Sequence, residues 1–144
     1  MNLTAPVLPS QLFARTLVGR DLSGRIVNIT SIDAVAAEPR TAAYTTTKAA
    51  LAGLSRAMAV DLAPYGISVN CVAPGAISTD DAIARNGGPS FMEALARRVP
   101  SGRAGTADEV AAVVAFLLGD APDYLTGSSL TVDGGATTSL LWEA

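Results

Sequence analysis

Residues 25–29 (RIVNI) and residues 67–72 (ISVNCV) are short apolar runs that flank a long segment rich in alanine and leucine, residues 41–63. The two runs are rich in β-branched residues, which is typical of buried strands. The long segment predicts a helix, because Pro64 and Gly66, two residues that end helices, follow it directly. A strand, a helix and a second strand in this order predict two parallel strands joined by a helical crossover.

The pattern outside this unit continues to alternate between helices and strands. We expect helices over residues 5–17, 91–98 and 106–119, and a last strand over residues 129–132. Thr106 followed by Glu109 forms a capping box that opens the third of these helices. Three apolar strands joined by helical crossovers predict an α/β fold with a parallel sheet, in a single domain over residues 1–144. Such sheets bind ligands at the carboxyl ends of their strands, where we expect the site.

Composition excludes several classes of function. The 10 basic and 13 acidic residues give a net charge of −3, so the chain lacks the basic surface that nucleic-acid binding needs. Without histidine it cannot build a Ser-His-Asp triad or a histidine metal site, and we expect no metal. A hydrolase using Ser31 would therefore lack its base, and Asp33 cannot replace it. Cys71 is the only cysteine, and no signal peptide or membrane-spanning run is evident, so we expect a cytoplasmic protein away from membranes.

Tyr44 and Lys48 are four residues apart in the predicted helix, so they share one face. A phenol with a pKa of about 10 is a poor acid-base catalyst at neutral pH, and an adjacent ammonium lowers that pKa. The alternative is an ordinary surface pair. However, Lys48 is the only lysine of the chain, and a lone lysine falls four residues after a tyrosine by chance in roughly 2% of cases. The spacing therefore favours a site that requires an amine.

Ser31 lies thirteen residues before Tyr44, at the carboxyl end of the first predicted strand. A hydroxyl at this place could donate a hydrogen bond to a substrate carbonyl oxygen, or accept one from the corresponding alcohol. The alternative is an ordinary strand-end serine or a helix cap. Thr30 could serve almost as well as Ser31, so spacing leaves the choice between them open.

Taken together, these segments resemble the short-chain dehydrogenases/reductases. The resemblance runs over essentially the whole chain and rests on an ordered set of motifs: residues 24–31 (GRIVNITS), Tyr44-x-x-x-Lys48, residues 62–67 (LAPYGI), Val69-Asn70, residues 73–75 (APG) and residues 130–135 (LTVDGG). It implies that Tyr44 is the catalytic acid/base and that Ser31 holds the substrate oxygen. It also implies that Lys48 binds the nicotinamide ribose and lowers the tyrosine pKa. The family's fourth catalytic residue matches Asn2, which would hold a water in the proton relay.

The resemblance also implies a cofactor and a reaction. Residues 74–79 (PGAIST) match the turn that holds the nicotinamide in this family, with Pro74, Gly75, the backbone of Ile77 and the hydroxyl of Thr79. Tyr44 and Lys48 would complete the cofactor contacts. The implied chemistry is hydride transfer between NAD or NADP and the carbonyl or alcohol of a small-molecule substrate. The overall pattern is most similar to the 3-oxoacyl-[acyl-carrier-protein] reductase type.

The matching segments belong to the C-terminal catalytic half of the family. The glycine-rich turn and the strands that hold the adenine end of the dinucleotide have no counterpart in these 144 residues. We therefore expect an incomplete, doubly wound Rossmann-like sheet whose first strand has a free apolar edge, and poor dinucleotide binding by the chain alone. A start-site error, a second chain that supplies the missing half, or a homo-oligomer would each explain this pattern. The alternative function is a truncated, non-catalytic subunit that acts in oligomerisation or regulation with full-length partners.

Overall fold

A parallel sheet, with three strands among the described residues, organises the fold. The computed structural model describes residues 2–85 and 88–139. The strands are β1 (Gly24–Ile29), β2 (Ile67–Pro74) and β5 (Ser129–Val132), in the order β1-β2-β5. Both pairings are parallel, with Ile26 opposite Val69 and Val72 opposite Leu130, which confirms the predicted α/β class. Strand β2 runs two residues further than expected, because its last residues, Ala73 and Pro74, pair with β5.

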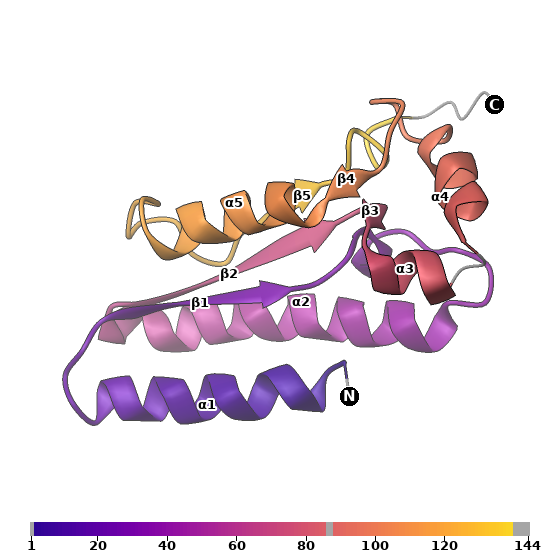
Figure 1. Cartoon of the computed structure of the whole chain (residues 1–144). Helices are drawn as coiled ribbons and strands as arrows, with labels where there is room; N and C mark the ends of the chain where they lie inside the picture. Colours follow the sequence, from indigo (N-terminus) through magenta and orange to yellow (C-terminus); the bar gives the residue numbers. More distant parts are fainter. Residues whose placement is uncertain (1, 86–87, 140–144) are drawn as a thin grey trace.

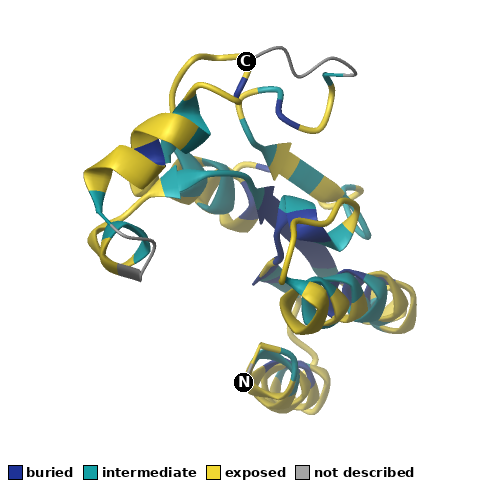
Figure 2. Ribbon diagram, turned by 90° about the vertical axis from the view of Figure 1, so that its right-hand side faces the viewer, coloured by how far each residue is buried: buried dark blue, intermediate teal, exposed yellow. Residues whose placement is uncertain are grey.

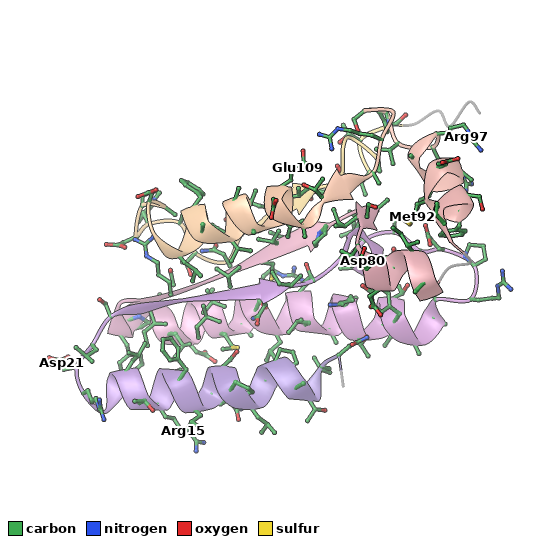
Figure 3. The ribbon with its side chains drawn as sticks, in the orientation of Figure 1. Arg15, Asp21, Asp80, Met92, Arg97 and Glu109 are labelled. Atoms are coloured by element: carbon green, nitrogen blue, oxygen red, sulfur yellow. The ribbon has the colours of Figure 1, made fainter. Side chains whose placement is uncertain are left out.

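Helices cover both faces of this sheet (Figure 1). Helices α1 (Thr4–Val18) and α2 (Ala42–Leu62) lie on one face, and α5 (Ala107–Leu118) lies on the other. The buried residues concentrate on the strands and on the helix surfaces that face them, whereas α1 is exposed over most of its surface (Figure 2). Arg15 projects from α1 away from the sheet (Figure 3).

Two apolar clusters hold the layers together. On the α2 face, Ala59 packs with the strand residues Ile26, Ile67 and Val69. On the α5 face, Val72 packs with Leu117 and Ala121. Ala, Val, Leu and Ile therefore form most of the core, as the scarcity of aromatic residues requires.

Replacing Leu117 by alanine is expected to lower the free energy of unfolding by about 3 kcal/mol. Leu117 is 1% exposed, so its truncation leaves a cavity between α5 and the sheet. Leu118 is the matched control on the same helix, because it is 50% exposed and its truncation should change stability by less than about 1 kcal/mol. Urea unfolding followed by circular dichroism measures both changes, and equal losses would contradict the packing described above.

The helix ends follow from local chemistry. Helix α2 passes into a 3₁₀ turn, η2 (Ala63–Tyr65), and Gly66 then turns the chain into β2 with φ of 67°, a left-handed value that favours glycine. At the start of α5 the predicted capping box is present: Thr106 Oγ1 accepts from the Glu109 N–H, and Glu109 Oε2 accepts from the Thr106 N–H at 2.8 Å. Arg103 also pairs with Glu109, and together these partners lower the pKa of Glu109 to about 2.

Asn70 connects β2 to the segment before β5. Its side chain is 1% exposed and uses both ends of the amide: Nδ2 donates to the Leu125 carbonyl at 2.8 Å, and Oδ1 accepts from the Ser128 N–H at 3.0 Å. A further hydrogen bond joins β2 to the segment before β5: the Val69 N–H donates to the Thr126 hydroxyl at 3.0 Å. These bonds fix where β5 enters the sheet.

Residues 77–106 form more regular structure than the sequence predicts. One helix was expected over residues 91–98, but there are two, α3 (Asp80–Arg85) and α4 (Pro89–Ala96). Helix α4 begins two residues early, because Pro89 occupies the first turn, where its fixed φ suits a helix. Two short strands, β3 (Ile77–Ser78) and β4 (Gly105–Thr106), pair in parallel and were not predicted. Met92 of α4 is 7% exposed and points from α4 back toward α3 (Figure 3).

Candidate active site

A cleft of about 330 Å³ opens at the carboxyl ends of β1 and β2. Its position is the one expected for a ligand site in a parallel sheet. Six of the predicted site residues line it together: Ser31, Tyr44, Lys48, Pro74, Gly75 and Ile77. The strand ends supply Ser31 and Pro74, and the first two turns of α2 supply Tyr44 and Lys48.

Tyr44 and Lys48 face the cleft from the same side of α2. The Lys48 ammonium lies 5.6 Å from the centre of the Tyr44 ring, and Tyr44 keeps 40% of its surface exposed. Burial lowers the pKa of Lys48 below its ordinary value, since the charged form loses hydration. Both residues line the cleft, which distinguishes them from the ordinary surface pair that was the alternative.

The Lys48 ammonium is held by the backbone of β1. The Thr30 N–H donates to the Val72 carbonyl of β2. The Ile29 carbonyl belongs to the same trans peptide unit and points in the opposite direction, toward the other edge of β1. At that edge Lys48 Nζ donates to the Ile29 carbonyl at 2.9 Å. No strand of the described residues pairs with this edge of β1, and Ile29 is 43% exposed there, as the sequence predicts. One of the three ammonium protons is thus engaged, and two remain for a ligand.

Hydrogen bonding shows which of the two neighbouring hydroxyls, that of Thr30 or that of Ser31, is available to a substrate. The Thr30 hydroxyl is buried and donates to the Val72 carbonyl at 3.1 Å, so its proton is used within the sheet. The Ser31 hydroxyl accepts from the Asp33 N–H at 3.1 Å and caps the 3₁₀ turn η1 (Ile32–Ala34). Because this bond uses only an acceptor position, the Ser31 proton is left to donate to a substrate oxygen. The alternative of an ordinary cap is compatible with that role, since one hydroxyl can do both.

Two predicted residues lie outside this cleft. Asn2 lines a second cavity, of about 460 Å³, together with Lys48 and Ile29. Lys48 and Ile29 therefore border both cavities, whereas Asn2 and Tyr44 each line only one of them. Thr79 is not among the residues that line the first cleft, and its hydroxyl accepts from the Ala82 N–H at 3.1 Å at the start of α3.

Sequence reasoning missed one part of the site, the start of α5. Ala107 and Val110 of α5 line the cleft, because the β3–β4 pair brings the start of α5 beside Ile77. Strands of two residues leave no periodic signal, so nothing in the sequence indicates this approach. Asp33 is not among the residues that line the cleft; it is buried, and burial, followed by the negative charge of Glu38, raises the pKa of its carboxyl.

Two other kinds of site are absent from the described residues. In residues 2–85 and 88–139, no group of three or more Cys, Asp or Glu side chains is placed to hold a metal ion. In the same ranges, no helix is both long and apolar enough to cross a membrane.

Comparison with known proteins identifies the family. The family model described as Enoyl-(Acyl carrier protein) reductase matches residues 1–137. The chain belongs to the short-chain dehydrogenase/reductase family. The resemblance carried by the Ser31, Tyr44 and Lys48 segments is thereby confirmed at the level of the family.

Individual family members show how much of a short-chain dehydrogenase/reductase this chain represents. Protein FixR of Bradyrhizobium diazoefficiens is 45% identical over 136 residues, which are 94% of this chain and 46% of FixR. The 3-oxoacyl-[acyl-carrier-protein] reductase FabG of Rickettsia bellii is 42% identical over 112 residues, 78% of this chain and 46% of FabG. A gluconate 5-dehydrogenase from Burkholderia cenocepacia J2315, solved with NADP and tartrate, superimposes with a TM-score of 0.88 at 37% identity, covering 96% of this chain and 54% of that one. The chain spans about half the length of these short-chain dehydrogenases/reductases.

Proposed function

We propose that this chain carries the catalytic half of an NAD(P)-dependent oxidoreductase that transfers hydride between the nicotinamide and a carbonyl or alcohol substrate. The observation that supports it is the meeting of Ser31, Tyr44 and Lys48 in one cleft at the strand ends. The phenol hydroxyl of Tyr44 gives a proton to the carbonyl oxygen during reduction and removes it during oxidation. Ser31 donates a hydrogen bond to the same oxygen, and the Lys48 ammonium stabilises negative charge on the phenol.

The donor groups of the cleft fit the nicotinamide end of a dinucleotide. Lys48 has two free ammonium protons for ribose hydroxyls, and the backbone of Ile77, with Pro74 and Gly75 beside it, borders the same space. When bound, the cofactor would supply the hydride. Gly75 is required at this point, because an added Cβ would lie 2.8 Å from Cβ of Asp133. Thr79 and Asn2 would join the site as the family resemblance implies, the first at the carboxamide and the second through a water beneath Lys48.

The substrate and the choice between NAD and NADP go beyond the family assignment. The relatives named above are a 3-oxoacyl-[acyl-carrier-protein] reductase in one case and a gluconate 5-dehydrogenase in another, and the latter was solved with NADP and tartrate. We propose NADP or NAD as cofactor and a small carbonyl compound as substrate. Pairing with a second copy, or with a chain that holds the adenine end, is part of the proposal.

A labelled cofactor tests the reaction directly. The chain is incubated with a large excess of NADPH carrying deuterium at C4 of the nicotinamide, because dinucleotide binding by the chain alone is expected to be poor, and with a panel of small ketones and 3-oxoacyl thioesters. We expect deuterium at the carbinol carbon of a product, detected by mass spectrometry, and none when the chain is omitted. A chain that transfers no deuterium to any member of the panel would contradict the proposal.

A second function is favoured by one observation, the exposed apolar surface of α1. Leu8 and Leu12 are 61% and 69% exposed and lie one turn apart on this helix. Such neighbouring leucines are typical of a surface that associates with another chain. A non-catalytic subunit that pairs through this surface therefore stays the alternative. It predicts pairing in sedimentation velocity together with no deuterium transfer by the paired chain, whereas the catalytic half would show the transfer.

A further inference from the structure

A buried polar pair, Asn28 and Ser55, joins strand β1 to helix α2. Asn28 is 5% exposed and Ser55 is 1% exposed. Asn28 Nδ2 donates to Ser55 Oγ at 2.8 Å, and Ser55 Oγ donates to the Leu51 carbonyl at 2.8 Å. The single hydroxyl proton of Ser55 is therefore used within α2, and its oxygen accepts from Asn28. Neither side chain takes part in the chemistry proposed above.

This pair interrupts an apolar interface. Ile26, two residues before Asn28 on the same face of β1, packs with Ala59, four residues after Ser55 on α2. An apolar pair of similar shape at positions 28 and 55 would hold the two layers together about as well, because replacing both partners of a buried hydrogen bond costs little stability. What the polar pair adds is direction, since apolar contacts tolerate a small slide and a hydrogen bond does not.

The pair sets the register between β1 and α2. Two residues of a strand span about 6.6 Å and four residues of a helix span about 6 Å, so the contact of Ile26 with Ala59 and that of Asn28 with Ser55 follow in step. A slide of one helical turn in either direction would bring Ala59 or Leu51 beside Asn28 and leave its buried amide without a partner, which costs free energy. The buried side chains of α2 are mostly small and resist such a slide weakly: Leu51, Ala52, Ser55 and Ala59.

The same register places Lys48. Ile29 follows Asn28 on β1, and Lys48 lies seven residues before Ser55, about two turns nearer the start of α2. Lys48 Nζ thereby reaches the Ile29 carbonyl at 2.9 Å and lies 5.6 Å from the centre of the Tyr44 ring. The lysine side chain is long and flexible, so it does not hold the helix in place. The side chains of Asn28 and Ser55 are short, so their bond fixes the backbones directly.

The second cavity lies at this junction of β1 and α2. Asn28, Ile29, Lys48 and Leu51 all line it, so side chains do not fill the space beside Lys48. Close packing holds a side chain only where neighbours surround it. The bond between Asn28 and Ser55, at the border of the cavity, supplies a restraint that packing does not.

We propose that Asn28 and Ser55 are positioning residues: their hydrogen bond sets the register of α2 against β1 and thereby holds the Lys48 ammonium beside Tyr44. The inference rests on the proposed function, in which Lys48 stabilises negative charge on the phenol. A displacement of about 1 Å near the reacting groups lowers a rate by as much as about 100-fold. We therefore expect loss of the pair to slow hydride transfer by about tenfold while the fold is kept.

The single lysine of the chain makes a direct test possible without turnover. A chain grown with lysine that carries ¹³C at Cε gives one NMR methylene signal, that of Lys48. The Tyr44 ring should displace this signal from the position of free lysine, since the ammonium lies over the ring. In the double variant Asn28→Leu/Ser55→Ala the displacement should fall by at least half. Its Tm should stay within about 5 °C of the wild type, because both polar groups are removed together.

Ser10→Ala is the matched control. Ser10 is also a buried helical serine, and its Oγ donates to the carbonyl four residues earlier, that of Pro6, at 2.7 Å, but it lies on α1. The same loss of a hydroxyl there should leave the Lys48 signal and the transfer rate unchanged. Deuterium transfer at saturating NADPH gives the rates of all three chains.

A wild-type signal at the free-lysine position, or a double variant whose signal keeps the wild-type position, would overturn the proposal. An equal change in Ser10→Ala would do the same, as would a Tm of the double variant lowered by much more than 5 °C, which would assign the pair to stability. An unchanged transfer rate in the double variant would overturn the positioning role and leave the proposed function intact. A Lys48 signal that moves as expected, in chains that transfer no deuterium, would overturn the proposed function and leave the placement of Lys48 by this pair in force.

Discussion

Replacing Tyr44 by phenylalanine should reduce the rate of hydride transfer by about 1000-fold or more, while the free energy of unfolding stays within about 1 kcal/mol of the wild type. The reason is that the phenol hydroxyl is the proton donor of the cleft, and it makes no hydrogen bond that holds the fold. The ring itself is retained by the substitution. Deuterium transfer from labelled NADPH and urea unfolding measure the two quantities.

Tyr65→Phe is the matched control for this experiment. Tyr65 is 54% exposed in the turn after α2 and does not line the cleft, so the same loss of a hydroxyl should leave the rate unchanged. If Tyr44→Phe retained the wild-type rate, Tyr44 would not be the acid/base.

Lys48→Arg should be nearly as damaging, with a loss of about 100-fold, although the charge is kept. The Lys48 ammonium fits between two cavities and donates to the Ile29 carbonyl at 2.9 Å. A guanidinium is larger and planar, so it cannot occupy this position and keep the same distance from the Tyr44 ring. The loss should appear in both the rate of transfer at saturating NADPH and the NADPH concentration needed to reach half of that rate, measured by deuterium transfer over a range of NADPH concentrations.

The reverse exchange on the same helix, Arg56→Lys, provides the control. Arg56 is exposed, and the cleft is lined by other residues, so exchanging these two cations there should alter neither quantity. Wild-type rates in Lys48→Arg would show that any cation suffices at position 48 and that the single lysine of the chain is accidental.

The sequence predicts the sheet and the centre of the site for a physical reason. Buried parallel strands need β-branched runs, and the residues that follow such runs must meet at one edge, which brings Ser31 to the same cleft as Pro74. The spacing of Tyr44 and Lys48 is a property of one helix and depends on no distant contact. These predictions therefore required only local patterns.

The parts that could not be predicted depend on tertiary contacts. Nothing in composition or periodicity separates Thr30 from Ser31, because the difference is a hydrogen bond to Val72, which lies far along the chain. The burial of Asp33 could not be predicted from the sequence either, since charged residues in loops are usually exposed. The placement of α5 against Ile77 depends on strands too short to leave a pattern.

The amide of Asn70 has a consequence for how this chain can vary in length. Surface loops usually tolerate insertions and deletions. Here, however, the Leu125 carbonyl and the Ser128 N–H must both reach one buried side chain, which sets the number of residues between them. An extra residue placed between positions 125 and 128 would break one of these bonds and shift the entry of the last strand. Length changes should therefore be accepted in the exposed residues 122–124 and rejected between Leu125 and Ser128.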